Sequence, residues 1–183
     1  FGEGLMRTPS NFGLKGEAPD NPALLDWLAL EFVRSGWSVK QMHRLIVTSA
    51  AWRRSSVISP AHAEKDPENR LFAHQNRRRL EAEAVRDALL SVGGSLDLEM
   101  GGEVPGAGKT RSYYDGKDSA FQSKRRTIYL PVPRHKAYEL LAIFDYADTS
   151  VHLDKRPVTT VPQQALFMLN DPLVRAQAKA LAQ

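Results

Sequence analysis

The densest group of chemically versatile side chains in this sequence lies at residues 77–88, where seven residues are charged. If this stretch is a helix with 100° per residue, Glu81 lies in line with Val85 and Ala88, on the face expected to point to the core. A carboxylate held in a cleft has a shifted pKa, and such groups gather at functional sites. The alternative, which we favour, is a buried ion pair between Arg78 and Glu81 that fixes the packing.

A second polar segment, at residues 159–164, could face the same cleft and help to bind a ligand. The candidate polar cluster then consists of Arg78, Glu81, Arg86, Thr159, Gln163 and Gln164. No catalytic role is assigned to any of them. The sequence contains no Gly-x-Ser-x-Gly elbow, and it leaves open whether the protein is an enzyme.

The charged stretch also predicts a solvated helix face that carries Arg79, Glu83, Arg86 and Asp87. On that face Arg79 with Glu83, and Glu83 with Arg86, would form surface ion pairs worth about 0.3–0.5 kcal/mol each. Asp145, Asp148 and Asp154 could be paired acids with Glu139, but a solvated face is the interpretation that we favour for them.

Other motifs that could carry chemistry are weak. The five histidines do not form the His-x-x-x-His spacing of a metal site, and His43 is predicted to be a hydrogen-bonded core residue. Residues 106–110 resemble part of a phosphate-binding loop, but Glu103 stands where that motif requires glycine. We therefore expect neither a metal nor a bound cofactor in this chain.

Two adjacent helical segments allow a helix-turn-helix interpretation. Lys40, Gln41, Arg44 and Thr48 share the outer face of the second segment, as a DNA-reading helix requires. However, bulky Phe32 stands where a close helix crossing usually needs a small residue, and the net charge of +4 includes many interleaved acids. A plain helical hairpin is the favoured interpretation, and nucleic acid is not an expected partner.

Composition narrows the class of protein. The chain has 183 residues, of which 42% are hydrophobic and 25% charged, as is ordinary for a soluble globular domain. It has no cysteine, which excludes disulfides, thiol catalysis and the covalent attachment of a c-type haem. No apolar run approaches the ~20 residues that span a bilayer. Because the chain starts at Phe1 and ends within a helical pattern, we expect it to be a piece of a longer protein.

Start and stop signals predict a mainly α fold, a compact multi-helix domain that spans residues 1–183. The predicted helices begin at Pro22, Val39, Asp66, Pro162 and Pro172, and two more cover residues 78–92 and 136–144. Residues 93–124, which hold seven of the twelve glycines, predict a long Gly-rich loop insertion. Residues 127–132 predict one short strand or hairpin.

Several segments together resemble one family, the carboxy-terminal domain of unknown function in large planctomycete-type cytochrome c-associated proteins. The segments are Phe1-Gly2-Glu3-Gly4-Leu5, Arg7-Thr8-Pro9-Ser10, Leu24-Leu25-Asp26-Trp27-Leu28, Ser35-Gly36-Trp37-Ser38, His43-Arg44-Leu45-Ile46-Val47-Thr48-Ser49, Asp66-Pro67-Glu68-Asn69-Arg70, the Arg-Arg-Leu-Glu-Ala-Glu run that ends at Glu83, and Thr159-Thr160-Val161-Pro162-Gln163-Gln164-Ala165-Leu166. The resemblance implies an extracytoplasmic location, periplasmic or secreted, and neighbouring domains that include a second uncharacterised one and often a c-type haem domain. It implies no catalytic residues.

Three functions follow as expectations. The first is a non-catalytic scaffold or interaction module that packs against neighbouring domains of a larger exported protein. The second is an enzyme or ligand-binding domain that acts on an extracellular polysaccharide. The third, DNA binding, has the weakest support.

Overall fold

The computed structural model describes residues 1–102, 122–132 and 137–183. Within these ranges the chain is mainly helical and has no β-sheet, only an isolated bridge between Asp97 and Arg125. The predicted mainly α, multi-helix fold is confirmed. Most of the predicted Gly-rich loop, including the segment that resembles a phosphate-binding loop, lies outside the described residues.

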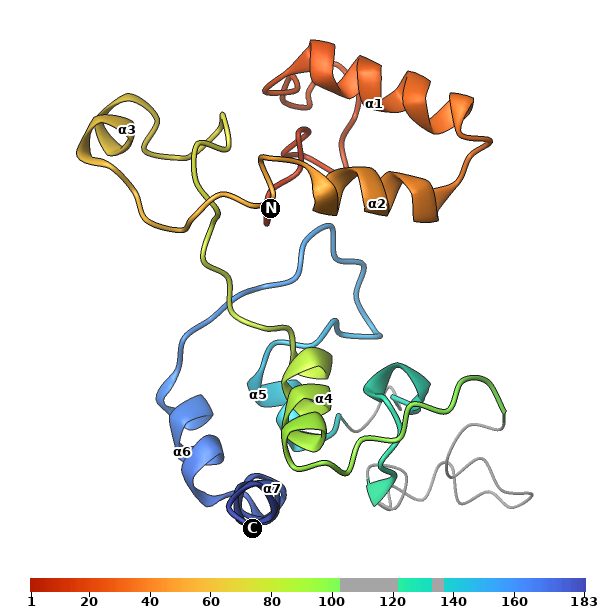
Figure 1. Cartoon of the computed structure of the whole chain (residues 1–183), viewed down its shortest axis with the longest axis vertical. Helices are drawn as coiled ribbons and strands as arrows, with labels where there is room; N and C mark the ends of the chain where they lie inside the picture. Colours follow the sequence, from red (N-terminus) through yellow and green to blue (C-terminus); the bar gives the residue numbers. More distant parts are fainter. Residues whose placement is uncertain (103–121, 133–136) are drawn as a thin grey trace. The chain divides into compact units, whose positions relative to one another are not determined.

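Backbone contacts divide the chain into two compact units, residues 1–78 and residues 79–183 (Figure 1). The first holds helices α1 (Pro22–Arg34), α2 (Val39–Thr48) and α3 (Pro60–Lys65). The second holds α4 (Ala82–Val92), the short 3-10 helix η3 (Thr127–Tyr129), α5 (Glu139–Ile143), α6 (Pro162–Asn170) and α7 (Pro172–Leu181). The single domain over the whole length stays a prediction.

Helices α1 and α2 form a hairpin, and their caps are those that the sequence predicts. The Asn21 side chain accepts a hydrogen bond from the Leu24 amide at 3.0 Å, and Ser38 accepts one from the Gln41 amide at 3.2 Å. At the end of α1, Gly36 has a φ of +69°, the left-handed conformation that closes a helix. The plain helical hairpin is thus the arrangement found.

We expect Gly36→Ala to lower the free energy of unfolding by about 1 kcal/mol, because a Cβ disfavours the left-handed conformation. A Cβ at this position would meet no atom within 4 Å, so the cost comes from the backbone conformation alone. Urea unfolding followed by tryptophan fluorescence measures it, since all three tryptophans lie in the first unit. Gly36→Asn should cost less, because Asn tolerates this conformation. Equal stability of the Ala variant and the wild type would contradict the prediction.

The prediction of a helix that starts at Asp66 is wrong. Asp66 instead ends α3, and its carboxylate accepts hydrogen bonds from the amides of Arg70 and Leu71, both at 2.8 Å. These bonds make a turn in place of a helix. Buried Asn69 extends the turn, because its side-chain amide donates to the His74 carbonyl at 2.8 Å. Local polar bonds therefore hold the segment between α3 and the second unit.

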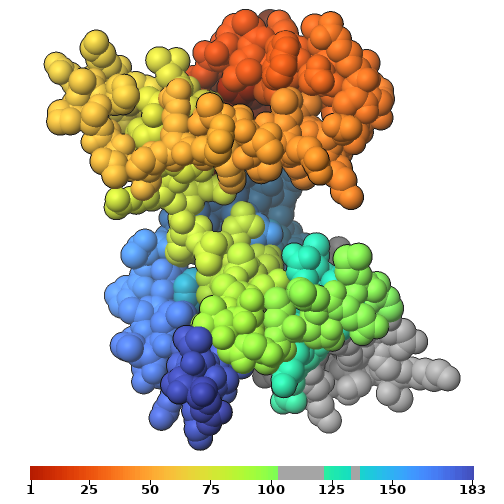
Figure 2. Space-filling view, in the orientation of Figure 1, coloured from red at the N-terminus to blue at the C-terminus, as the bar shows by residue number. Residues whose placement is uncertain are grey.

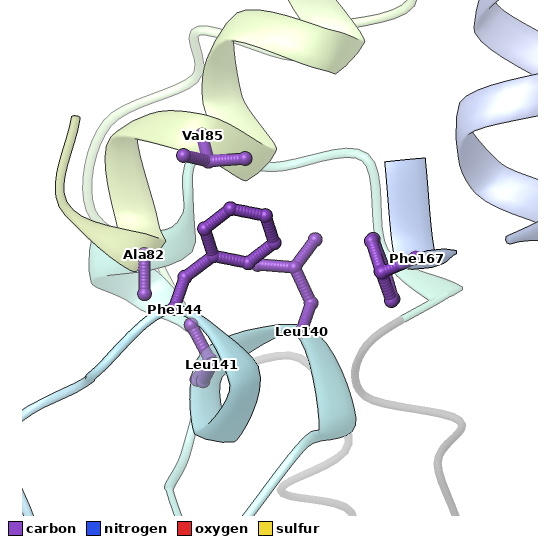
Figure 3. Packing of buried hydrophobic residues seen from close by; sticks show 6 residues of the cluster. All are labelled: Ala82, Val85, Leu140, Leu141, Phe144 and Phe167. Atoms are coloured by element: carbon purple, nitrogen blue, oxygen red, sulfur yellow. The ribbon is translucent and has the colours of Figure 1, made fainter. Parts of the chain in front are cut away.

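In the second unit, α4 contacts η3, α5 and α7, and α6 contacts both α5 and α7. The buried apolar core is drawn in Figure 3 and consists of Ala82, Val85, Leu140, Leu141, Phe144 and Phe167. The Phe144 and Phe167 rings meet edge to face, with centroids 6.0 Å apart. The core thus joins α4, α5 and α6, with Phe144 directly after α5.

Helix α4 is shorter than predicted. It begins at Ala82 and not near Arg78, because Glu81 is extended and serves as its N-cap residue. The predicted strand at residues 127–132 is not confirmed, since Thr127–Tyr129 forms one turn of 3-10 helix. The turn is closed by hydrogen bonds from the amides of Tyr129 and Leu130 to the carbonyls of Arg126 and Thr127, each at 3.0 Å.

Candidate functional site

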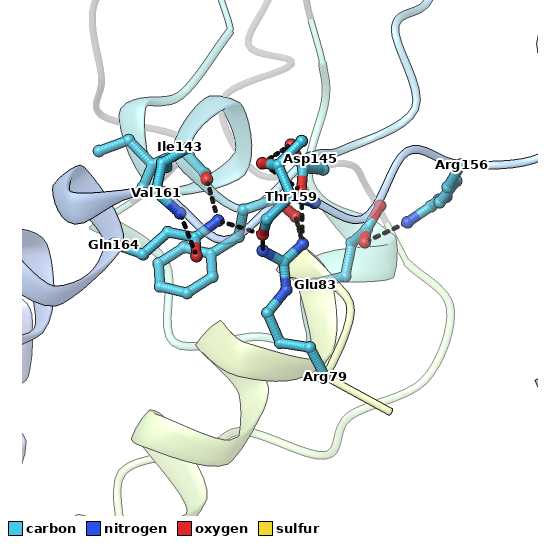
Figure 4. Close-up of polar contacts among 9 residues, drawn as sticks. Arg79, Glu83, Ile143, Asp145, Arg156, Thr159, Val161 and Gln164 are labelled. Carbon is cyan, nitrogen blue, oxygen red and sulfur yellow. Dashed lines mark hydrogen bonds and ion pairs between the residues drawn. The ribbon is translucent and has the colours of Figure 1, made fainter. Parts of the chain in front are cut away.

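A polar network in the second unit surrounds Asp145, the second residue after α5 (Figure 4). Its Oδ2 atom receives hydrogen bonds from Arg79 Nη2 at 2.6 Å and from the Thr159 amide at 2.7 Å. The Thr159 hydroxyl donates to both carboxylate oxygens at 3.0 Å. Arg79 also donates to the carbonyls of Thr159 and Phe144. One carboxylate and one guanidinium thereby tie together three separate segments of the unit.

The environment of Asp145 favours its charged form. Burial by itself raises the pKa of this carboxyl group, but the hydrogen bonds from Thr159 and Arg79 outweigh burial and hold the pKa below its usual value. The residue also has a φ of +58°, a conformation that Asp adopts more readily than most residues. Asp145 is therefore an ionised anchor in a tight turn. The predicted solvated face is wrong for Asp145, whereas Glu139, Asp148 and Asp154 are exposed as predicted.

Gln164, at the start of α6, extends this network inward and is 8% exposed. Its amide nitrogen donates to the carbonyls of Ile143 and Thr159 at 3.0 and 3.1 Å. Its amide oxygen accepts from the Val161 backbone at 3.4 Å. Two of the predicted cluster residues, Thr159 and Gln164, thus meet in the structure, and they meet around Arg79 and Asp145, which the sequence did not place there.

Glu81 is not the buried carboxylate that its helical position suggests. Its side chain is 67% exposed and lies 3.3 Å from Arg156. The same Arg156 nitrogen is 2.6 Å from Glu83, whose predicted pairs with Arg79 and Arg86 do not form. Burial raises the pKa of Glu83, but the hydrogen bond from Arg156 and further polar contacts leave the pKa lowered. The prediction that Glu81 is buried is wrong because α4 begins only at Ala82, so helical periodicity does not apply to the residues before it.

Arg86 is the buried charged residue among the described residues of this unit, with 1% of its surface exposed. It was predicted both for the cluster and for a solvated face, and the second prediction is wrong. Its guanidinium donates to the carbonyls of Arg125, at 3.0 Å, and Ser123, and to the Thr127 hydroxyl at 3.2 Å. Asp87 accepts from the Thr127 amide at 2.8 Å. These bonds take up backbone groups of Ser123, Arg125 and Thr127, just before and at the start of η3.

The predicted cluster is therefore divided. Thr159 and Gln164 belong to the Asp145 network, Arg86 holds residues 123–127, and Glu81 lies at the surface beside Arg156. Arg78 is the last residue of the first unit, where its side chain lies close to Gly2 and its charge helps to lower the pKa of the Phe1 amino group, after the larger effect of burial. Gln163 lines a separate groove.

That groove has a volume of about 400 Å³ and lies where α5, α6 and the start of α7 meet. Four apolar and four polar residues line it: Ile143, Leu166, Phe167 and Pro172, with Glu139, Gln163, Asn170 and Asp171. Its volume is within the usual range for small-molecule sites. The sequence does not predict this groove. It predicts only that two helices begin at Pro162 and Pro172, and these are the helices that meet at the groove.

Neither a metal-binding cluster nor a membrane-spanning helix is found in the part of the chain that the structure describes. No group of three His, Asp or Glu residues there could hold a metal ion. His43, predicted to be a core residue, is exposed. None of the described helices is long and apolar enough to cross a bilayer.

These features define a mainly helical domain in which buried Arg, Asp and Gln side chains bind the backbone of loops. The model of a protein family described as PSD1, a protein of unknown function (DUF1553), matches residues 1–183, and the chain belongs to this family. No curated protein and no solved structure matches the chain.

Proposed function

We propose that this domain is a non-catalytic interaction module, whose binding surface is the outer face of α1. The observation that carries the proposal is the burial pattern of this helix. None of its residues is buried, and Trp27, Leu30 and Val33 are 46%, 56% and 51% exposed. The side chains of the α1–α2 hairpin reach the surface in the space-filling view (Figure 2). A helix with apolar residues on all sides is normally covered by other protein.

The polar networks support a non-catalytic role. The guanidinium of Arg86 and the side-chain amide of Gln164 donate to backbone carbonyls. The carboxylate of Asp145 is occupied by Thr159 and Arg79. A general base or nucleophile needs a free polar atom facing a substrate, whereas these atoms brace loops. The enzyme and DNA-binding alternatives remain predictions from the sequence.

The partner that we propose for α1 is a neighbouring domain of a larger, exported, cytochrome c-associated protein. The motifs quoted above for that family support this context, including Leu24-Leu25-Asp26-Trp27-Leu28 on α1 itself. An extracytoplasmic location is part of the same proposal. A cofactor, where the larger protein has one, would be held by another domain.

The test is to replace Leu30 and Val33 by Ser together and to measure binding to the rest of the parent protein by calorimetry. We expect the affinity to fall at least about tenfold, because apolar residues at the centre of an interface carry much of its binding energy. The free energy of unfolding of the free domain should fall by about 1 kcal/mol per substitution, since each side chain is about half buried. Glu64→Ser, on exposed α3, is the matched control and should leave the affinity unchanged.

Two results would overturn the proposal. One is equal affinity of the double variant and the wild type. The other is a wild-type domain that forms a dimer by light scattering and loses it on Leu30 and Val33 replacement, which would assign the face to a second copy of the chain.

A further inference from the structure

The outer face of α2 carries positive charge that no described residue neutralises. Lys40 and Arg44 are exposed and lie one helical turn apart, which places their Cβ atoms about 5–6 Å from each other. No Asp or Glu occurs between Glu31 and Glu64, so α2 and its flanking segments contain no acid. The first unit is described in full, and neither cation forms an ion pair with any described residue. The charge is therefore available to an anion from outside the chain.

Gln41 adds hydrogen-bonding groups to the same face. Its backbone amide donates to the N-cap residue Ser38, but its side-chain amide forms no hydrogen bond with any described residue. A free side-chain amide offers both a donor and an acceptor, as a partner with hydroxyl groups requires. Thr48, also exposed on this face, differs because its hydroxyl donates to the Arg44 carbonyl at 2.7 Å. The polar group that α2 leaves open is thus the amide of Gln41.

Trp37, the residue before the N-cap of α2, combines a strained backbone with an exposed ring. Its φ is +61°, a conformation that bulky residues rarely adopt. The indole meets the Phe32 ring edge to face, with centroids 5.3 Å apart, and yet 67% of Trp37 is exposed. Packing within the domain does not account for a strained and largely exposed Trp. Strained residues of this kind gather at ligand-binding sites.

An exposed indole beside two cations is complementary to an acidic sugar. One face of a pyranose ring presents C–H groups, and the electron-rich face of an aromatic ring attracts them. A uronate carboxylate pairs with Lys or Arg through charge-assisted hydrogen bonds. Duplex nucleic acid is the other common polyanion, but it carries one charge per about 1.7 Å, and a strong binder neutralises about 6–10 phosphates. The two cations of α2 match a polymer whose charges are sparse.

We propose that the outer face of α2 binds an acidic polysaccharide. Lys40 and Arg44 hold its carboxylates, Gln41 bonds its hydroxyl groups, and one sugar ring lies against Trp37. The site is separate from the outer face of α1, and its test needs no neighbouring domain. Failure of one proposal is therefore distinguishable from failure of the other.

The probe is an oligogalacturonate, and the same oligomer with methyl-esterified carboxylates is the matched neutral ligand. Calorimetry with the chain of residues 1–183 measures both affinities, and amide chemical shifts of the ¹⁵N-labelled chain locate the site. We expect the acid to bind at least about tenfold more tightly than the ester, a difference of ~1.4 kcal/mol, and to shift amides of Trp37 and α2. Its affinity should fall as salt is added.

Three results would overturn the proposal. They are equal affinities of acid and ester, shifts confined to segments outside Trp37 and α2, and tighter binding of a DNA duplex or a polyglutamate peptide of equal total charge.

Charge variants test the cations separately from the fold. Lys40→Gln combined with Arg44→Gln should weaken oligogalacturonate binding at least about tenfold and leave binding of the ester and the thermal midpoint unchanged, since both side chains are exposed. Lys65→Gln, on exposed α3, is the matched control and should bind as the wild type does. Unchanged affinity of the double variant would contradict the acidic-sugar site.

Trp37→Asn separates binding from packing. Asn adopts a positive φ more readily than Trp, so the strain released should offset the lost contact with Phe32 and leave the thermal midpoint nearly unchanged. Loss of the ring should weaken binding of the acid and of the ester alike, by about fivefold. A Trp37 that serves only to pack against Phe32 would give the opposite result, a lower thermal midpoint with unchanged affinity.

Discussion

Replacing Arg86 with Met should lower the free energy of unfolding by about 3 kcal/mol. Met keeps much of the volume, but it leaves the carbonyls of Ser123 and Arg125 and the hydroxyl of Thr127 without the donor that they share. Each buried polar group that loses its partner costs about 1–3 kcal/mol, and some of this is recovered as water enters. The loss is large for one substitution because a single side chain serves several groups at once.

The measurement is urea unfolding followed by circular dichroism at about neutral pH. Arg86→Lys should fall between wild type and Arg86→Met, because one ammonium keeps the charge but cannot reproduce the fork of the guanidinium. Burial, the largest effect, lowers the pKa of Arg86 against the opposing influence of Tyr138 and Asp87. Arginine nevertheless stays protonated near neutral pH, so the comparison does not depend on titration.

Arg175→Met is the matched control, since Arg175 lies exposed on α7. It should change the free energy of unfolding by less than about 0.5 kcal/mol. If Arg86→Met were no more destabilising than this control, the bonds to residues 123–127 would contribute nothing net to stability, and the description of Arg86 as an anchor would be wrong.

The sequence predicts helix starts well where a cap or a proline marks them. Asn21, Ser38, Pro162 and Pro172 each begin a helix as expected. These signals are local, because a cap is made within one turn of chain. Asp66 shows the limit of the same signal. An Asp followed by Pro can cap either a helix or a turn, and here its carboxylate caps a turn.

The polar networks could not be predicted, because their partners are far apart along the chain. Arg79 pairs with Asp145 across 66 residues, and no local pattern announces that contact. Helical periodicity gives the wrong position for Glu81, because α4 begins only at Ala82 and Glu81 itself is extended. The residue type of Gln164 marks it as a candidate, but only the structure shows that it is buried and donates to the carbonyls of Ile143 and Thr159.

Asp145→Asn should lower the free energy of unfolding by about 2 kcal/mol at about pH 7, because charge-assisted hydrogen bonds from Arg79 and Thr159 become weaker. Asn adopts a positive φ as readily as Asp, so this change leaves the turn intact and isolates the charge. Asp145→Ala should cost about 1 kcal/mol more, since a φ of +58° is strained for Ala.

The pH dependence separates the charge of Asp145 from simple packing. Its folded pKa is depressed below the unfolded value, so its contribution is fully present above the unfolded pKa, at about 4, and is lost as pH falls through the folded pKa. The stability difference between wild type and Asp145→Asn should therefore be constant from about pH 7 to about pH 5 and shrink at lower pH. Asp154→Asn, at an exposed carboxylate, should show almost no difference at any pH.

A double-mutant cycle assigns the effect to the pair. If Arg79 and Asp145 act together, Arg79→Met and Asp145→Asn combined should cost less than the sum of the single changes, by about 1 kcal/mol or more. Additive losses would mean that Thr159 alone holds the carboxylate. In that case Arg79 would contribute through the Phe144 and Thr159 carbonyls, and the turn after α5 would be fixed by two independent anchors and not by one ion pair.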